Sequence, residues 1–294
     1  MKDLVTQVII DNPAVRATNY KKMVQNYYNL VTDTYRQGWG NSFHFGLFSG
    51  SENLHEAVVT TERMIADKGG FCPDMKLLDI GCGIGGPALN IAEYSGAHIT
   101  GITIVERQIE IARQRAAERG LSERTEFIFA DAMKMPFADE SFDGIYMFDA
   151  GCYMPDKAAF YKECARVLRP GGVFIGSDWM CKDGLTANEE EKYIEPICRY
   201  HAVPHLITLD KLGKYLITAG LEIETLEDLA KQGNLLPNWE ILDNKIIKSI
   251  HGLVPWLIPP VLRMLTDGGY ALLDGARAGA FLIGHWQARK PIST

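Results

Sequence analysis

The sequence lacks three features that would place it in large classes of protein. It has no block of Lys or Arg, and its formal net charge is −7, which argues against a nucleic-acid or anionic-membrane partner. No apolar run is long enough to span a bilayer, and the N-terminus shows no basic-then-apolar export pattern. We therefore expect a cytoplasmic protein without a membrane span.

Metal-binding and disulfide patterns are also missing. The six cysteines are scattered, and no pair has the C-x-x-C spacing, so neither a zinc site nor a disulfide framework is predicted. No His, Asp or Glu cluster has ligand spacing, and we predict no metal. With 294 residues, 47% of them hydrophobic, the chain can form one large domain with an added cap. A homo-oligomer is compatible with the sequence, which leaves the oligomeric state open.

Strand and helix patterns alternate through the middle of the chain, as they do in a parallel sheet with crossover helices. Two further strands, expected at 221–226 and 279–286, follow a looser helical region. The pattern predicts an α/β fold with a seven-stranded Rossmann-like sheet and helices on both faces. The other expected strands are 76–80, 98–102, 125–129, 142–148 and 173–177, and the expected helices include 87–94, 106–119, 157–167, 187–200 and 208–219.

Four regions follow from this pattern. Residues 1–70 are expected to form an N-terminal helical lid with an aromatic loop, and residues 71–230 to form the sheet core with its cap helices. Residues 231–270 are apolar and broken by prolines, and we expect a helical cap insertion over an apolar pocket there. Residues 271–294 would supply the last core strand and the C-terminus.

A glycine-rich turn follows the first expected strand with the spacing D-x-G-x-G-x-G, from Asp79 to Gly85. Glycine lets a backbone turn sharply and approach a ligand closely. Pyrophosphate sites use G-x-G-x-x-G with a later acidic residue, which disfavours a nicotinamide dehydrogenase here. A carboxylate before the first glycine repels phosphate but accepts a hydrogen bond from an ammonium group. These properties fit the amino-acid end of S-adenosylmethionine (SAM).

This turn resembles motif I of the class I SAM-dependent methyltransferases. The resemblance implies SAM as the cofactor and a reversed last strand in the sheet. It also implies that a first set of residues holds the cofactor, namely Asp79, Gly81, Cys82 and Gly83.

Two further segments resemble cofactor motifs of the same superfamily. Thr103, Ile104 and Gln108 match the Thr-apolar-x-x-x-Gln variant of sterol, tocopherol and cyclopropane-forming methyltransferases, which implies ribose and methionyl contacts. Many class I enzymes instead end this strand in an acidic residue. Asp131 and Ala132 match the positions that bind the adenine amino group and a ring nitrogen.

The aromatic segment at 27–45 closely resembles the signature of sterol C-methyltransferases, and weaker similarity extends over residues 20–225. The resemblance implies cofactor contacts by Tyr28 and Ser42. The chain departs from the family at Asp149, where the family has Glu, and at Tyr153, where it has His. From about residue 232 it matches no sterol-binding region. We therefore expect a small hydrophobic acceptor that is isoprenoid-like, either a terpenoid natural product or a sterol side chain.

Methylating an alkene carbon leaves a carbocation, which aromatic faces stabilise by about 1–2 kcal/mol per desolvated ring. Trp39 and Phe43 are expected to do so. Proton loss then needs a base, for which His44 and Asp149 are the first candidates and Tyr153 and His201 the others; Asp149 is also expected to contact the cofactor. Proton loss or cyclisation would end the reaction.

The predicted function is SAM-dependent C-methylation of an isoprenoid alkene. One alternative is O- or N-methylation of a small natural product, in which a base such as His44 deprotonates a hydroxyl. A second alternative is a protein that binds SAM or a hydrophobic ligand without chemistry.

Overall fold

The computed structural model describes residues 2–250 and 258–292. Part of the expected cap insertion, residues 251–257, lies outside the described residues. Seven strands form one sheet in the order β3-β2-β1-β4-β5-β7-β6. The strands are β1 Lys76–Ile80, β2 His98–Thr103, β3 Thr125–Phe129, β4 Phe142–Phe148, β5 Leu168–Cys181, β6 Glu222–Asp228 and β7 Phe281–Arg289.

The sheet is mixed. Strands β1 to β5 pair in parallel, whereas β7 runs antiparallel to both β5 and β6. The predicted strands and the reversed last strand are confirmed. Because the parallel strands share one direction, the segments after β1, β2, β3 and β4 all emerge at the same edge of the sheet.

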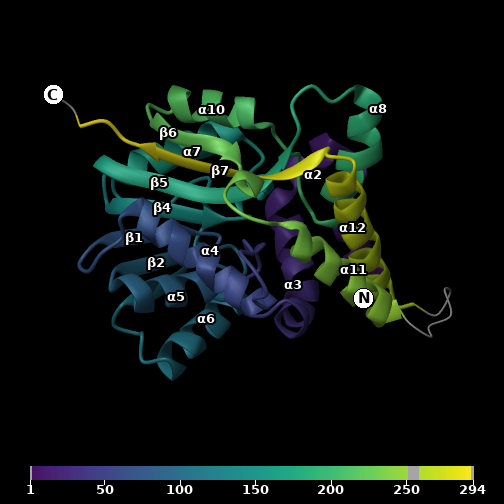
Figure 1. Cartoon of the computed structure of the whole chain (residues 1–294), viewed down its shortest axis with the longest axis horizontal. Coiled ribbons are helices and arrows are strands. Elements are labelled where there is room, and N and C mark those ends of the chain that lie inside the picture. The colour runs from purple at the N-terminus through teal and green to yellow at the C-terminus, as the bar shows by residue number, and fades with distance from the viewer. Residues whose placement is uncertain (1, 251–257, 293–294) are drawn as a thin grey trace.

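Helices cover both faces of the sheet (Figure 1). On one face pack α4 (Leu54–Gly69), α5 (Gly86–Ser95) and α6 (Glu106–Glu118), and on the other α7 (Lys157–Val167) and α10 (Leu209–Thr218). The sequence placed α4 in the lid. Its buried Ile65 and Ala66 instead join the core under α5, because α4 presents an apolar face to the sheet layer.

The remaining α-helices form a separate group beside the sheet. Figure 1 shows α3 next to α11 and α12, at the end of the sheet opposite the C-terminus. Helix α12 continues beyond the boundary expected at residue 270. None of the helices in the described ranges is long and apolar enough to cross a membrane. The group comprises α1 Lys2–Val8, α2 Pro13–Thr18, α3 Tyr20–Gly38, α8 Ala187–Glu189, α9 Glu195–Tyr200, α11 Leu236–Ile250 and α12 Pro260–Arg277.

Local signals in the sequence define the starts of two helices. The Asn53 side chain accepts a hydrogen bond from the Glu56 backbone N–H (3.2 Å), and the Glu56 carboxylate accepts one from the Asn53 N–H (2.9 Å). This reciprocal pair is a capping box, which satisfies two of the donors that a helix N-terminus leaves free. Asn12 caps α2 ahead of Pro13 in a similar way.

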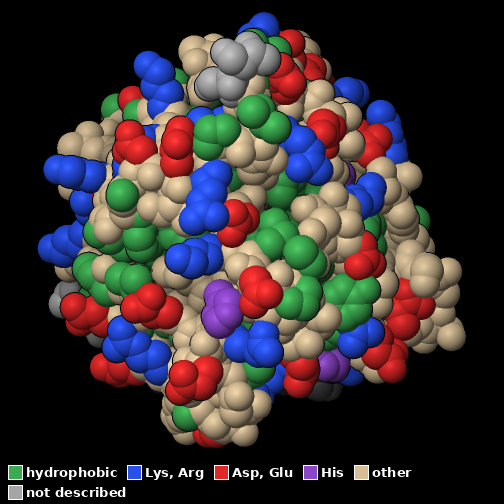
Figure 2. Space-filling view, turned by 90° about the vertical axis from the view of Figure 1, so that its left-hand side faces the viewer, with side chains coloured by type: hydrophobic (Ala, Val, Ile, Leu, Met, Phe, Trp, Pro, Cys, Tyr) green, Lys and Arg blue, Asp and Glu red, His purple; other side chains and the backbone are tan. Residues whose placement is uncertain are grey.

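The face of the molecule shown in Figure 2 carries acidic and basic side chains in alternation. On that face the blue and red groups are interspersed, without a broad area of one sign. This distribution agrees with the mixed charge pattern of the sequence.

Candidate active site

Two adjoining hollows lie at the carboxyl edge of β1 to β4. We call the first the motif cleft, because residues of all three sequence motifs line it, and the second the lid cavity, because α3, α11 and α12 enclose it. The motif cleft has a volume of about 90 Å³ and the lid cavity about 440 Å³. Three side chains line both hollows, namely Phe43, His44 and Asp149.

The glycine-rich turn forms the floor of the motif cleft. Gly81 and Gly83 have φ angles of 76° and 50°, a region that other residues rarely adopt. A Cβ added to Gly81 would lie 2.4 Å from the Cβ of Ala150. The turn therefore requires glycine both for its conformation and for its close approach to the segment after β4.

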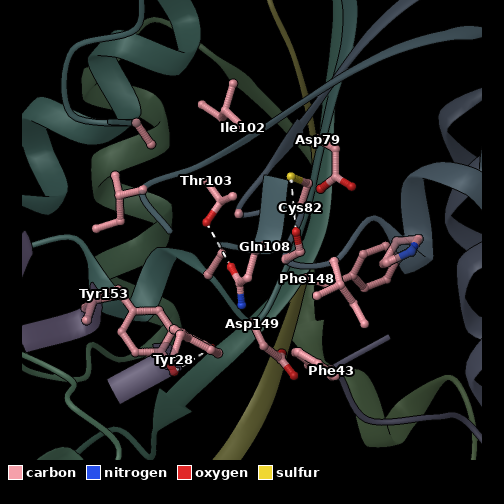
Figure 3. A pocket seen from close by; sticks show the side chains of 18 of the residues that line it. Tyr28, Phe43, Asp79, Cys82, Ile102, Thr103, Gln108, Phe148, Asp149 and Tyr153 are labelled. Atoms are coloured by element: carbon pink, nitrogen blue, oxygen red, sulfur yellow. Dashed lines mark hydrogen bonds between the residues drawn. The ribbon is translucent and has the colours of Figure 1, made fainter. Parts of the chain in front are cut away.

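Asp79, at the end of β1, is a buried carboxyl group that faces the cleft (Figure 3). Its side chain is 2% exposed, and its Oδ2 has no hydrogen-bond partner in the described part of the chain. Burial raises the pKa of Asp79 to about 8. A buried polar atom without a partner is costly, so this site fits a ligand that brings an ammonium donor.

The residues of the second motif lie together at the cleft, and their contact with the cofactor stays a prediction. The Thr103 hydroxyl donates a hydrogen bond to the Gln108 side-chain oxygen at 3.0 Å (Figure 3). Gln108 in turn donates to the Thr32 hydroxyl on α3 at 3.5 Å. Ile104 lines the cleft, and its carbonyl accepts a bond from Gln25 at 2.9 Å. The motif thus joins the sheet edge to α3.

Helix α3 closes the cleft over the third motif. The Tyr20 hydroxyl donates to Asp131 at 2.6 Å, and the Lys21 ammonium lies 2.6 Å from the same carboxylate. Ala132 also lines the cleft. Tyr20 was not predicted, although it is eight residues before Tyr28 and therefore lies on the same helix face, together with Val24.

Glu62 on α4 is the centre of a buried network that the sequence analysis missed. Its side chain is fully buried and accepts a hydrogen bond from the Ser42 hydroxyl at 2.6 Å and from Asn90 at 2.6 Å. The His44 Nε2 lies 3.2 Å from the same carboxylate. Ser42 therefore binds Glu62 and is not among the residues that line the motif cleft. The sequence did contain a signal for Glu62, because an acidic residue stands among the apolar residues on the buried face of α4.

The Glu62 network shifts the pKa of His44. Burial alone would lower the pKa of His44, but the hydrogen bond and negative charge of Glu62, with the charge of Asp149, raise it above its ordinary value. The ring stacks on Phe148 with centroids 4.2 Å apart. Glu62 therefore favours the protonated form of His44 relative to burial alone. The assignment of His44 and Asp149 as the first candidate bases stays a prediction.

Asp149 follows β4 and lies where the two hollows meet. Its backbone is left-handed (φ 49°), an uncommon conformation for a residue other than glycine. The residue is 7% exposed. Burial raises the pKa of Asp149 to about 7, and the positive charge of His44 opposes that rise. Hydrogen bonding by the Trp179 side chain and the Phe45 backbone also lowers the pKa of its carboxyl group, although neither contact meets strict hydrogen-bond geometry. A carboxylate with such a pKa can act as a general base at neutral pH.

Tyr153 and Tyr28 form a pair at the other wall of the cleft. The Tyr28 hydroxyl donates to the Tyr153 hydroxyl at 2.9 Å, with ring centroids 5.7 Å apart (Figure 3). Burial raises the pKa of both phenols well above the ordinary value. Both are therefore neutral at pH 7, which removes Tyr153 from the candidate bases.

Aromatic side chains line much of the lid cavity. The Trp39 indole N–H donates to the His44 carbonyl at 2.8 Å, and the Lys245 ammonium lies over the Trp39 ring at 5.2 Å. Trp39 contacts the cavity and not the motif cleft. Its role in stabilising a carbocation stays a prediction.

His201 also lines the lid cavity. Its Nδ1 lies 3.0 Å from the Tyr27 hydroxyl, and burial lowers the pKa of His201 to about 4. The imidazole is therefore neutral. Within residues 2–250 and 258–292, no cluster of His, Cys, Asp or Glu could hold a metal ion.

The sheet order and the three motifs at the strand ends, the glycine turn among them, together define a class I SAM-dependent methyltransferase. Residues 78–176 match the model of a methyltransferase domain family. The matched segment contains the glycine turn, the Thr103–Gln108 pair and Asp131.

Relatives identify the family more closely. Cycloartenol-C-24-methyltransferase 1 of Oryza sativa subsp. japonica is 38% identical over 301 aligned residues, covering 95% of this chain and 88% of the relative. The sterol 24-C-methyltransferase ERG6B of Gibberella zeae is 38% identical over 226 residues, covering 76% of this chain. The chain spans about 60% of the length of that relative. The protein belongs to the sterol C-24-methyltransferase family.

Solved structures share the whole fold. The cyclase SpnF superposes with a TM-score of 0.78 at 25% identity, covering 93% of this chain and 97% of the other. Geranyl diphosphate C-methyltransferase from Streptomyces coelicolor A3(2), solved with S-adenosyl-L-homocysteine, gives a TM-score of 0.72 at 18% identity. That comparison covers 92% of this chain and 97% of the other, and shows the fold alone.

Proposed function

We propose that this protein transfers the methyl group of SAM to an alkene carbon of an isoprenoid acceptor. The observation that carries the proposal is Asp149, a buried carboxyl group with a pKa of about 7 that lines both the motif cleft and the lid cavity. The relatives are named for C-methylation of sterols. The apolar, aromatic walls of the lid cavity support a hydrocarbon acceptor.

The motif cleft fits the cofactor in several places. Asp79 would accept hydrogen bonds from its ammonium group, Thr103 and Gln108 would hold the ribose and methionyl portion, and Asp131 would bind the adenine amino group. When bound, SAM supplies an electrophilic methyl group. The glycine turn, whose conformation depends on the positive φ angles of Gly81 and Gly83, would let the ligand approach the protein backbone closely.

The chain's own residues act on the acceptor. The lid cavity excludes water and orients the alkene, which lowers the entropic cost of reaction. When the carbon–carbon bond forms, the electron pair of the alkene is consumed and positive charge develops on the neighbouring carbon. The Asp149 carboxylate stabilises that charge, and the π face of Phe43 adds to the effect.

Proton loss completes the reaction. Asp149 can take a proton from a carbon next to the cation, and the released electron pair forms a new double bond. With a pKa of about 7, Asp149 is largely ionised just above neutrality and can accept that proton. Glu62 raises the pKa of His44, and the positive charge of a protonated His44 lowers the pKa of Asp149 relative to burial alone.

The test is methyl transfer from isotopically labelled SAM to a panel of acceptors, namely a sterol with an unsaturated side chain, linear prenyl compounds, prenylated indoles and simple phenols. We expect label on a carbon that was part of an alkene, located by NMR. Label on oxygen or nitrogen alone would favour the O- or N-methyltransferase alternative. SAM binding without transfer to any acceptor would favour the non-catalytic one.

A role in natural-product biosynthesis and a cytoplasmic location are also part of this proposal. All six cysteines are free thiols, which supports a reducing compartment.

A further inference from the structure

We propose that Lys245 and Lys248 of α11 form an oxyanion-binding site in the lid cavity, so that the acceptor is an acidic isoprenoid. The acceptor would carry a carboxylate or a phosphate ester at one end and the reacting alkene at the other. This inference rests on the proposed function, because it takes the lid cavity as the acceptor site.

Lys245 is a half-buried cation for which the described part of the chain shows no ion pair. Its side chain lines the lid cavity and lies over the Trp39 ring at 5.2 Å. Burial lowers the pKa of Lys245, which shows that the protein environment disfavours its charge. None of the described carboxylates forms an ion pair with it. A ligand oxyanion would offset this cost.

Lys248 brings a second positive charge to the same wall. It lies three residues after Lys245 on α11, so both side chains share one helix face, and both line the cavity. Like charges at this spacing repel each other in the absence of an anion. Among the described residues that line the cavity, Asp149 is the one acid, and it lies beside His44.

The contacts along the cavity wall separate the two ends of the acceptor. Lys245 lies over Trp39, Trp39 donates to the His44 carbonyl, and the charge of His44 acts on Asp149. Lys245 and Asp149 therefore have different neighbours, Trp39 and His44 respectively, and none of the ion pairs among the described residues joins the two. This order suits the chemistry, because positive charge that develops on the acceptor would form beside Asp149 and away from the lysines.

The chemistry of the site selects anions. Ammonium groups donate strong, charge-assisted hydrogen bonds to carboxylate or phosphate oxygens, and these bonds are about twice as strong as neutral ones. The indole beneath Lys245 restricts its ammonium, so less freedom is lost on binding. A neutral alcohol can accept one bond from the same lysine but forms no ion pair.

The experiment is isothermal titration calorimetry of the full-length protein, saturated with S-adenosylhomocysteine, against three probes with one hydrocarbon chain. The probes are farnesol, farnesoate and farnesyl diphosphate. We expect an acidic probe to bind about tenfold more tightly than farnesol, a ratio typical of one charged hydrogen bond. Lys245→Gln should remove most of that ratio, because it weakens binding of the acidic probes much more than binding of farnesol.

Lys248→Gln should remove part of the ratio, and Lys231→Gln, at an exposed site outside the cavity, should leave it unchanged. A thermal melt of each variant checks that it folds. Tighter binding of farnesoate than of the diphosphate would identify a carboxylate acceptor, and the reverse a phosphate ester. Equal affinity for alcohol and acids, no binding of any probe, or a ratio that survives in the double Lys→Gln variant would overturn the proposal.

The outcome is separable from that of the proposed function. Methyl transfer to an alkene carbon together with equal binding of alcohol and acid would remove only the oxyanion site. A clear acid preference without methyl transfer to carbon would retain the binding site and contradict the C-methyltransferase proposal.

Discussion

The motif cleft and the lid cavity differ in how the chain builds them. The cleft is formed mainly by short segments at the ends of the parallel strands. Its polar side chains can form hydrogen bonds with specific groups of a ligand. The cavity is formed by α3, the aromatic loop, α11 and α12, and its walls are largely apolar. The comparison suggests that the strand ends determine cofactor binding, whereas the lid determines which acceptor is used.

The largest expected effect is a loss of SAM binding caused by a change in the motif cleft. Gly81→Val should lower the affinity for SAM by at least about 100-fold, since a left-handed residue with a Cβ 2.4 Å from Ala150 requires the turn to shift. Calorimetric titration with SAM measures this. Gly184→Val is the matched control, because Gly184 also has a positive φ (77°) but has open space around it. Equal SAM affinity in the two variants would contradict the role of the turn.

The second effect should be confined to the cavity. Trp39→Ala removes a wall of the lid cavity and the hydrogen bond to the His44 carbonyl, so we expect acceptor turnover to fall by about tenfold or more. The affinity for SAM should stay within about threefold of wild type. Tyr94→Ala, at an exposed aromatic remote from both hollows, is the control. A parallel loss of SAM binding would show that the two regions are not separate.

The third prediction concerns the wall that the two regions share. The active form of Asp149 is ionised, so turnover should rise with pH through its pKa of about 7. Glu62→Gln removes the carboxylate that raises the pKa of His44. With His44 neutral, its charge no longer lowers the pKa of Asp149, and the rise should move to higher pH.

The measurement is the pH dependence of kcat/KM in the Glu62→Gln variant, with Glu118→Gln on the exposed side of α6 as control. A purely structural role for Glu62 would lower activity at every pH without moving the profile. An unmoved profile would therefore remove Glu62 and His44 from the control of Asp149.

The smallest effect lies outside both regions. Asn53→Ala removes the cap of α4 and should lower the free energy of unfolding by about 1 kcal/mol. Urea unfolding followed by circular dichroism measures the change. Asn53→Asp keeps an acceptor at the cap and should restore most of the stability. A loss of SAM affinity in Asn53→Ala would mean that α4 is coupled to the cleft more strongly than its contacts indicate.

The sequence predicted the cleft better than the cavity for a physical reason. Asp79 and Thr103 lie at the ends of β1 and β2, and Asp131 lies just after β3, so the parallel sheet alone places them at one edge. Glu62 and Lys245 come from helices far from those motifs in the chain. Their position depends on how α4 and α11 pack, which periodicity does not specify.

His44 illustrates the same limit within the site. Sequence reasoning selected it as a base from its place in the aromatic segment, and the structure does bring it to both hollows. The pKa of His44, however, depends on Glu62, which is 18 residues away in the sequence and lies on α4. The aromatic segment predicted where His44 lies, whereas its acid–base behaviour depends on a tertiary contact that the sequence does not show.

The most direct test of the account is Asp149→Asn, which keeps the shape of the side chain and removes its charge at the junction of the two regions. The account predicts that SAM affinity changes by no more than about threefold, while turnover to carbon-methylated product falls by about 100-fold or more, the contribution expected of a general base. Calorimetry with SAM and a labelled methyl-transfer assay on one sample measure both. Turnover close to wild type in Asp149→Asn would contradict the account.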